Sequence, residues 1–268
     1  MLINNALVLG TFNRHNNNIQ RREKNVETLS SGKRINKAAD DASGLSICES
    51  MKAQIRGLSQ GQRNTQDGLS LLQYAEGQIQ GVHEDLLKMR EMSIRFSNDT
   101  YSDSDREIAE KEFEQLKKDI TYISKTAEVN GIKVMEEDKK LQIHVRYEPY
   151  KVEEIGLRKI NLDSLDLSSE NILSRENSSK CLEKIDNALE KVLDYRESLG
   201  VTMNRFECLL KDSSNAENNT TASLSRIEDI GTAMASMNLF KNDVLVKYTN
   251  AMMAHANQDT NNTIQLLK

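Results

Sequence analysis

The stretch IRGLSQGQRNTQDGLSLLQYAEGQIQGVHEDLLKM, residues 55–89, decides the fold of this chain. Its apolar positions, with one Thr among them, recur at spacings of three, four and seven residues. A stripe sustained over about five heptads is typical of a long helix that packs against partner helices. We predict a helix over about residues 43–98, which would be roughly 80 Å long. The positions of the stripe are Ile55, Leu58, Thr65, Leu69, Leu72, Ile79, Val82, Leu86 and Met89.

A second stripe of the same kind lies in the C-terminal half and predicts a partner helix. Between this stripe and the C-terminus, residues 215–221 are polar, so this segment is either a solvated helix face or a break. The second stripe consists of Leu182, Ile185, Leu189, Val192, Leu199, Met203, Phe206 and Leu210. Helical spacing then continues through Leu224, Ile227, Ile230, Met234, Met237, Val244 and Tyr248.

The N-terminal segment, about residues 3–29, is weakly amphipathic and predicts a further helix. Ser30-Ser31-Gly32 ends it, because Gly suits the position after a helix C-terminus. A charged connector follows over residues 33–43.

Ser104 and Glu107 have the spacing of a capping box, which predicts that a shorter helix runs over residues 105–127. The helical period places four of its apolar residues inward. These are Ile108, Leu116, Ile120 and Ile123.

A small β region is predicted after this helix. Asn130-Gly131 is a turn signal, and alternation of apolar residues predicts a strand over residues 141–147. Pro149 follows at a turn, and residues 152–157 form a second strand. Residues 158–178 are polar with irregularly placed Leu, which is typical of a loop. The fold class is therefore mainly α: an elongated bundle of long heptad-patterned helices with a small β region in the middle of the chain and paired N- and C-terminal helices.

The composition excludes several classes of protein. The chain has no Trp, one Pro and 4% aromatic residues, which suits helices packed side by side better than a thick core. A net charge of −5 argues against nucleic-acid binding. The apolar run at residues 6–9 is too short for a secretory signal, and no stretch suits membrane insertion, so composition alone predicts a cytosolic protein. The three cysteines are dispersed, which predicts no disulfide framework. They are Cys48, Cys181 and Cys208.

The sequence predicts no catalytic, cofactor or metal site. His83-Glu84 begins like a zinc-protease motif, but Leu87 stands where the second His should be. The other histidines lie in separate segments, and the glycine-rich patterns of nucleotide-binding sites are absent from the sequence. Asp40-Asp41 is interpreted as connector surface and not as a catalytic carboxylate pair, because the side chains of adjacent residues diverge. The Met-rich C-terminal positions favour packing or partner binding over metal binding.

Several blocks in order resemble the bacterial flagellins over nearly the whole chain. Residues 29–45, LSSGKRINKAADDASGL, are similar to the family's "LSSGxRINxAxDDAAGLAI" signature. Residues 54–58 (QIRGL), 64–71 (NTQDGLSL), 75–77 (AEG) and 89–92 (MREM) continue the pattern, and Asn130-Gly131 matches the family's "FNG" with Val129 in place of the aromatic. Near the C-terminus the resemblance covers residues 225–230 (SRIEDI), 254–258 (AHANQ) and 265–268 (QLLK).

This resemblance implies a secreted, extracellular structural subunit that self-assembles into the flagellar filament for motility. Residues 1–44 and 229–268 would form a terminal coiled-coil module at the filament's inner core. Residues 45–228 would form a helical bundle with a small β region at about 131–170. The family is exported unfolded through the flagellar secretion channel, and its other partners include an export chaperone and hook-associated and cap proteins. Little room remains for an outer-domain insertion, so the chain resembles a short flagellin.

The two heptad stripes predict the residues of the bundle seam, and the resemblance implies roles for further residues. The bundle seam would consist of Ile55, Leu58, Leu69, Leu72, Ile79, Leu86, Leu182, Ile185, Leu189 and Val192. The polymerisation ends would use Leu29, Ile35, Ile227, Met234, Val244 and Leu267. An animal Toll-like receptor contacts strongly recognised flagellins at a "QRxREL" helix face and a Glu on the next helix. The matching positions here are Lys88, Arg90, Glu91, Met92 and Glu112.

The C-terminal block departs from the family pattern "RIRDVDMAxE". This chain has Glu228 in place of Arg and Gly231 in place of Asp, and Gly231 would fall inside a predicted helix at a cost of about 1 kcal/mol. Two other functions remain open at this point. A hook–filament junction protein shares terminal helices with flagellin, and a cytosolic coiled-coil scaffold shares the heptad pattern.

Overall fold

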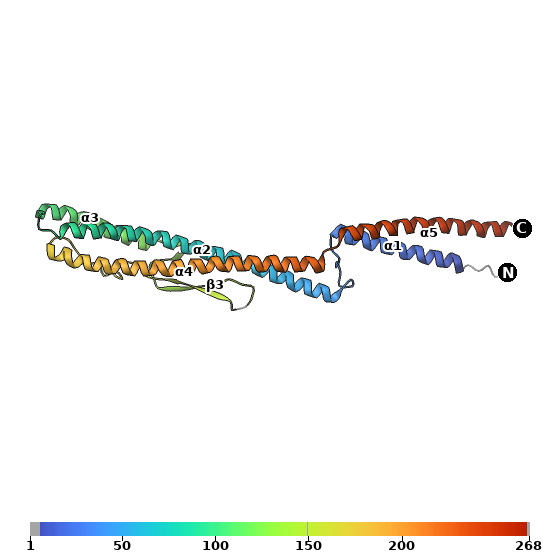
Figure 1. Cartoon of the computed structure of the whole chain (residues 1–268), viewed down its shortest axis with the longest axis horizontal. Coiled ribbons are helices and arrows are strands. Elements are labelled where there is room, and N and C mark those ends of the chain that lie inside the picture. Colours follow the sequence, from blue (N-terminus) through green and yellow to red (C-terminus); the bar gives the residue numbers. More distant parts are fainter. Residues whose placement is uncertain (1–5, 149, 267–268) are drawn as a thin grey trace. The chain divides into compact units, whose positions relative to one another are not determined.

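The computed structural model describes residues 6–148 and 150–266, with the side chains of 6–8 and 259–266 left aside. The described chain is mainly helical, which confirms the predicted fold class (Figure 1). It divides into a terminal unit, residues 1–55 with 218–268, and a central unit, residues 56–217. The helices are α1 (Ala6–Ser31), α2 (Ala42–Phe96), α3 (Asp103–Thr126), α4 (Arg175–Glu228) and α5 (Thr232–Leu266). The strands are β1 (Glu128–Val129), β2 (Ile132–Lys133), β3 (Lys139–His144) and β4 (Val152–Leu157).

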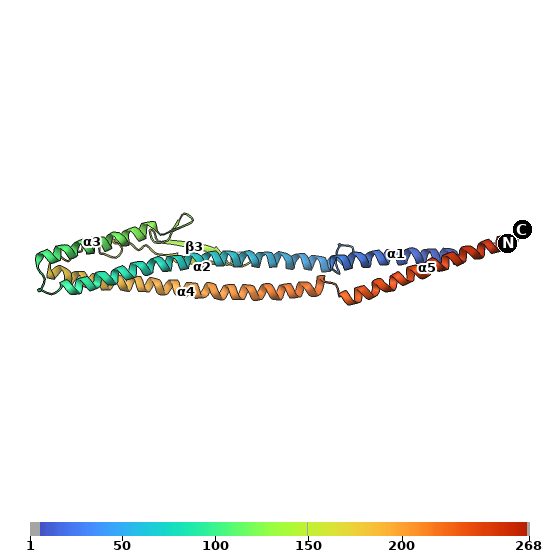
Figure 2. The same cartoon turned by 90° about the horizontal axis from the view of Figure 1, so that it is seen from above.

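The central unit is built on α2, α3 and α4, which lie side by side in both views (Figures 1 and 2). The heptad positions of α2 and α4 face each other in one apolar core, where Leu72, Ile79, Ile185 and Val192 are fully buried. Thr65 is the polar member of the first stripe, and its buried hydroxyl donates to the Gly61 carbonyl at 2.7 Å. Burial of these apolar side chains is the main favourable term in the stability of the bundle.

Helix α3 begins two residues earlier than the capping box at Ser104 and Glu107 predicted, so that prediction was wrong in register. Ser102 is the N-cap residue: its hydroxyl accepts from the Asp105 N–H, and the Ser102 backbone N–H donates to the Asp105 carboxylate. The sequence offers the same spacing twice, and the local pattern does not choose between the two. The inward assignment of Ile108 was also wrong, because its side chain is 65% exposed.

The central unit contains two β-hairpins; the turn at Asn130 and Gly131 and the second pair of strands were predicted, whereas strands β1 and β2 were not. In the first, β1 pairs with β2 across Asn130 and Gly131, whose φ angles are 50° and 80°. Two residues with positive φ are what a tight two-residue hairpin turn requires. In the second, β3 pairs antiparallel with β4, with Leu141 opposite Ile155. The predicted turn residue Pro149 lies outside the described residues.

The irregular segment between β4 and α4 contributes to the core, although its sequence predicted only a loop. Four of its apolar side chains are buried against the helices. They are Ile160, Leu165, Leu167 and Ile172. The segment therefore covers one side of the bundle instead of extending into solvent.

In the terminal unit, α1 and α5 run antiparallel and pack against each other. His15 Nδ1 lies 3.0 Å from Thr249 Oγ1, and Arg22 pairs with Asp243 at 3.5 Å. Gly32 follows α1 with φ of 70°, which confirms its predicted place after the helix C-terminus. The polar residues 215–221 are a continuous part of α4. Gly231 lies between α4 and α5, so the prediction that it falls inside a helix was wrong.

Candidate assembly interface

Helix α5 carries a stripe of large apolar side chains that the described part of the chain leaves exposed. Met234 is 71% exposed and Phe240 is 72% exposed. We call this the α5 stripe, and its spacing of three or four residues places its members on one helix face. Its members are Met234, Met237, Phe240, Val244, Tyr248 and Met252.

The opposite face of α5 packs on α1, and its most deeply buried side chains are mainly small or polar, with Leu239 and Leu245 of α5 half-buried. Ala235, Asn242, Val246 and Thr249 are buried there, and Asn18 is buried on α1. Because these residues form the contact with α1, the α5 stripe takes no part in it. Leu9, Phe12 and Val26 of α1 are also exposed, so both helices of the pair present apolar surface. A contiguous exposed apolar patch marks an interaction site.

The junction between α4 and α5 is tied to the connector after α1 by backbone hydrogen bonds. The Arg34 N–H donates to the Glu228 carbonyl, and the Ile230 N–H donates to the Gly32 carbonyl at 3.0 Å. The Arg34 guanidinium also donates to the Ile227 carbonyl at 2.8 Å. These bonds satisfy carbonyl groups that the end of α4 would otherwise leave without partners.

A buried carboxylate anchors the same junction. Glu228 accepts from Lys33 Nζ at 2.7 Å and from Lys52 Nζ at 3.0 Å. Burial alone would raise the pKa of Glu228, but the two ammonium groups outweigh it and hold the pKa below its ordinary value. The same contact raises the pKa of Lys52, with a smaller contribution from Glu49.

The residues assigned to the polymerisation ends fall into two groups. Ile35 is buried inside the terminal unit, and Leu29 and Ile227 are half-buried there. Met234 and Val244 belong to the exposed α5 stripe. Leu267 lies outside the described residues.

The residues assigned to the bundle seam lie mostly in the core of the central unit. Leu182 is half-buried, and Ile55 is half-buried in the terminal unit. The buried members are Leu58, Leu69, Leu72, Ile79, Leu86, Ile185, Leu189 and Val192.

Four of the five residues matched to the receptor contact are accessible. Lys88, Glu91 and Glu112 are exposed, and Arg90 is half-buried, with its Nε donating to Asp186 at 2.6 Å. Met92 is only 7% exposed and belongs to the apolar core. Its side chain therefore offers little surface to a partner.

The sequence interpretation missed Phe240 and the ionic junction. Phe240 follows Met237 at helical spacing and extends the α5 stripe, so the same periodicity that selected Met237 includes it. The Lys52–Glu228 contact joins distant segments, and local spacing carries no signal for it.

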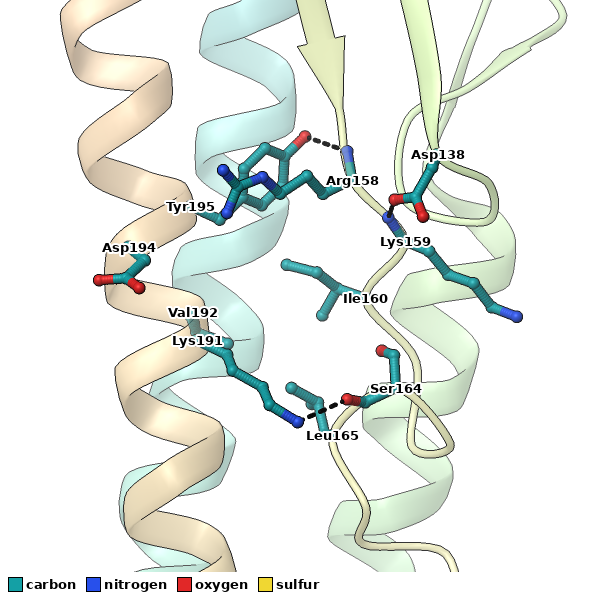
Figure 3. A pocket seen from close by; sticks show the side chains of 10 residues that line it. All are labelled: Asp138, Arg158, Lys159, Ile160, Ser164, Leu165, Lys191, Val192, Asp194 and Tyr195. Carbon is teal, nitrogen blue, oxygen red and sulfur yellow. Dashed lines mark hydrogen bonds between the residues drawn. The ribbon is translucent and has the colours of Figure 1, made fainter.

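Several polar groups of a small pocket beside α4 are hydrogen-bonded to one another (Figure 3). Its volume is about 210 Å³. The Arg158 N–H donates to the Tyr195 hydroxyl at 3.1 Å, and Lys191 donates to the Ser164 carbonyl at 3.0 Å. These hydrogen bonds hold β4, the segment after it and α4 together, so we interpret the pocket as a packing feature of the central unit. Within residues 6–148 and 150–266 there is no cluster of metal-ligating side chains, and no helix has the length and apolarity that crossing a bilayer demands.

Comparison with known proteins identifies the family. Residues 3–140 match the bacterial flagellin N-terminal helical region, and residues 182–267 match the bacterial flagellin C-terminal helical region. The chain is 38% identical to a flagellin of Halalkalibacterium halodurans over 100% of both chains. It is 34% identical to the flagellar filament 30.7 kDa core protein of Treponema maltophilum, over 91% of both chains.

A solved structure shares the fold. The structure of a putative flagellar hook-associated protein from Vibrio parahaemolyticus matches with a TM-score of 0.61 and 14% identity, over 71% of this chain and 100% of that chain. At that identity the likeness concerns the fold alone, whereas the full-length relatives carry the family. With both helical regions matched and relatives aligned from end to end, the chain belongs to the bacterial flagellins, the structural, non-enzymatic subunits of the extracellular flagellar filament.

Proposed function

We propose that copies of this flagellin assemble through the terminal unit, with the α5 stripe as the main apolar surface buried between subunits. The observation that supports this is the difference between the two faces of α5. Mainly small and polar residues pack on α1, while six large apolar side chains face away from it. Burying such side chains gives roughly 1.5–3 kcal/mol each, which makes the stripe the strongest unused source of association energy on α5.

In this proposal residues 1–44 and 229–268 form the polymerising module, and residues 45–228 form the surrounding shell. The subunit leaves the cell unfolded through the flagellar secretion channel. An export chaperone covers the α5 stripe before assembly, because an exposed apolar face would otherwise aggregate. Hook-associated and cap proteins contact the same module at the two ends of the filament.

The innate receptor is a further proposed partner, and its contact centres on Lys88, Arg90, Glu91 and Glu112. Met92 acts only as core support beneath that surface, because it is buried. Lys88 carries the charge of the family's Arg without its planar fork of donors, so recognition is weaker than for a "QRxREL" flagellin.

Salt-induced polymerisation followed by electron microscopy tests the assembly proposal. Phe240→Ser removes apolar area from the α5 stripe, and Ile108→Ser is the matched control, because Ile108 is an exposed apolar residue of α3. Neither change touches a core, so both monomers should keep their helix content. We expect Phe240→Ser to raise the critical concentration for filaments at least tenfold and Ile108→Ser to leave it nearly unchanged. Equal behaviour of the two variants would contradict the role of the stripe.

A further inference from the structure

The tip of the β3–β4 hairpin carries a tyrosine whose side chain is not packed against the rest of the described chain. Tyr150 is 94% exposed, and its φ of 68° lies in the left-handed region. A bulky side chain in that region is a strained outlier. Tyr is also a residue type that concentrates binding energy at protein interfaces. An exposed, strained aromatic residue therefore marks a candidate contact.

The base of the hairpin is hydrogen-bonded within itself and to α2, and these bonds fix the part of the chain that carries Tyr150. The Val145 N–H donates to the Lys151 carbonyl at 3.2 Å, and Asn64 of α2 donates to the His144 carbonyl at 3.0 Å. Glycines of α2 allow this close approach. A Cβ at Gly61 would lie 2.6 Å from the Val145 carbonyl oxygen, so a side chain there would displace the hairpin.

An apolar groove lies elsewhere on the central unit, between α2 and the two hairpins. Its volume is about 680 Å³. Half-buried apolar side chains line it and leave part of their surface open to solvent. They include Val129, Ile132, Leu141 and Ile143. Tyr150 does not fill the groove of its own chain, because its side chain is almost fully exposed.

The charges around the tip and the groove are complementary. Asp67 stands at the groove, and it is exposed without an ion pair or hydrogen bond to any residue that the structure describes. The tip carries Arg146 and Lys151, whose side chains likewise form no ion pair with the described residues, together with Glu148. The tip is therefore net positive, and the groove offers a free carboxylate.

We propose that Tyr150 of one copy inserts into this groove of a second copy, with Lys151 beside it pairing with Asp67. The two surfaces of the contact are different parts of the same chain, so a joined pair of subunits still has one free tip and one free groove. A heterologous contact of this kind repeats without closing and builds a filament. The inference rests on the assembly of this flagellin into filaments and adds a contact made by the central unit.

Disulfide cross-linking in filaments tests this contact directly. One chain carries Tyr150→Cys and the other Ile132→Cys, both with Cys208→Ser because Cys208 is the exposed native thiol among the three described cysteines. The two chains are mixed, polymerised with salt and oxidised with diamide. We expect linked dimers from the mixture in filaments, and none from either chain alone or from monomers. As a control, Tyr122→Cys replaces Tyr150→Cys, because Tyr122 is an exposed tyrosine of α3.

The outcomes separate this contact from assembly itself. Filaments that form without linked dimers, or that link equally well through position 122, would overturn the contact and leave the filament function intact. A wild-type chain that forms no filaments under any salt condition would instead count against assembly.

A charge exchange gives an independent readout. Asp67→Lys and Lys151→Asp should each raise the critical concentration about threefold to tenfold, whereas the double variant restores the opposite charges and should return it toward the wild-type value. Lack of any rescue would overturn the pairing of these two residues.

Discussion

Lys52 and Glu228 are 176 positions apart in the sequence, yet Lys52 Nζ lies 3.0 Å from Glu228 Oε1. The contact joins the first part of α2 to the last residue of α4 within the terminal unit. Lys33 completes it at 2.7 Å. The flagellin pattern has Arg at the position that matches Glu228, and the contacts of Glu228 explain why an acidic residue fits this chain. Two ammonium groups surround the position, and a third cation would be repelled.

Replacing Glu228 should destabilise the terminal unit in a pH-dependent way. Glu228→Gln removes the charge between Lys33 and Lys52, and we expect a loss of about 1.5–3 kcal/mol at pH 7. The folded-state pKa of Glu228 is lowered from an ordinary value of 4.5. Its contribution is therefore fully present above that value and is lost as the pH falls through the lowered folded pKa. Thermal unfolding at pH 7 and at pH 3 measures this.

The wild type and Glu228→Gln should differ at pH 7 and converge at the acidic end. A difference that stays constant across this range would show that the charge of Glu228 is not the source of the stabilisation.

Adjacent leucines of α2 test the helical register of the central bundle. Leu86 is fully buried, whereas Leu87 is exposed. Leu86→Asp places an unpaired charge in the core and should cost about 4 kcal/mol or more, whereas Leu87→Asp should stay within about 0.5 kcal/mol. Denaturant unfolding of the two variants gives both values. Similar midpoints would show that the register is wrong.

Two serines test where α3 begins. Ser102 caps the helix, and Ser104 lies inside its first turn. Ser102→Ala should cost about 1 kcal/mol, because one backbone N–H loses its acceptor, while Ser104→Ala should be close to neutral. Chemical denaturation distinguishes them, and a larger loss at Ser104 would restore the capping box at Ser104 and Glu107.

The long helices could be predicted from the sequence because their burial repeats with a local period. Leu72 and Ile185 occupy such periods, and both are buried as their spacing predicts. The β-hairpin turn at Asn130 and Gly131 was predictable for a similar reason, since its two positive φ angles depend on residue type.

Features that depend on contacts between distant parts of the chain could not be predicted from the sequence. The capping-box spacing occurs twice, two residues apart, and the local pattern does not distinguish the copy that is used, Ser102 with Asp105. Leu167 sits in a segment without periodicity, yet it is buried beneath the bundle. The exposure of Tyr150 and the burial of Met92 depend on neighbours distant in the sequence, so spacing did not reveal either.

Position 88 tests the proposed receptor contact. Lys88 is exposed, so Lys88→Arg should restore a forked hydrogen-bond donor and strengthen binding to the receptor ectodomain several-fold. Met92→Leu serves as the comparison, because its side chain is buried and the swap nearly conserves volume. A binding titration of the wild type and both variants measures the effect. Equal affinity of wild type and Lys88→Arg would contradict a role for this residue.

The most direct measurement is electron cryo-microscopy of filaments polymerised from the wild-type chain, at a resolution that shows side chains. We expect Met234, Phe240 and Tyr248 of the α5 stripe to be buried against neighbouring subunits, while α1 keeps its contact with the opposite face of α5. A filament in which these three side chains face solvent would contradict it.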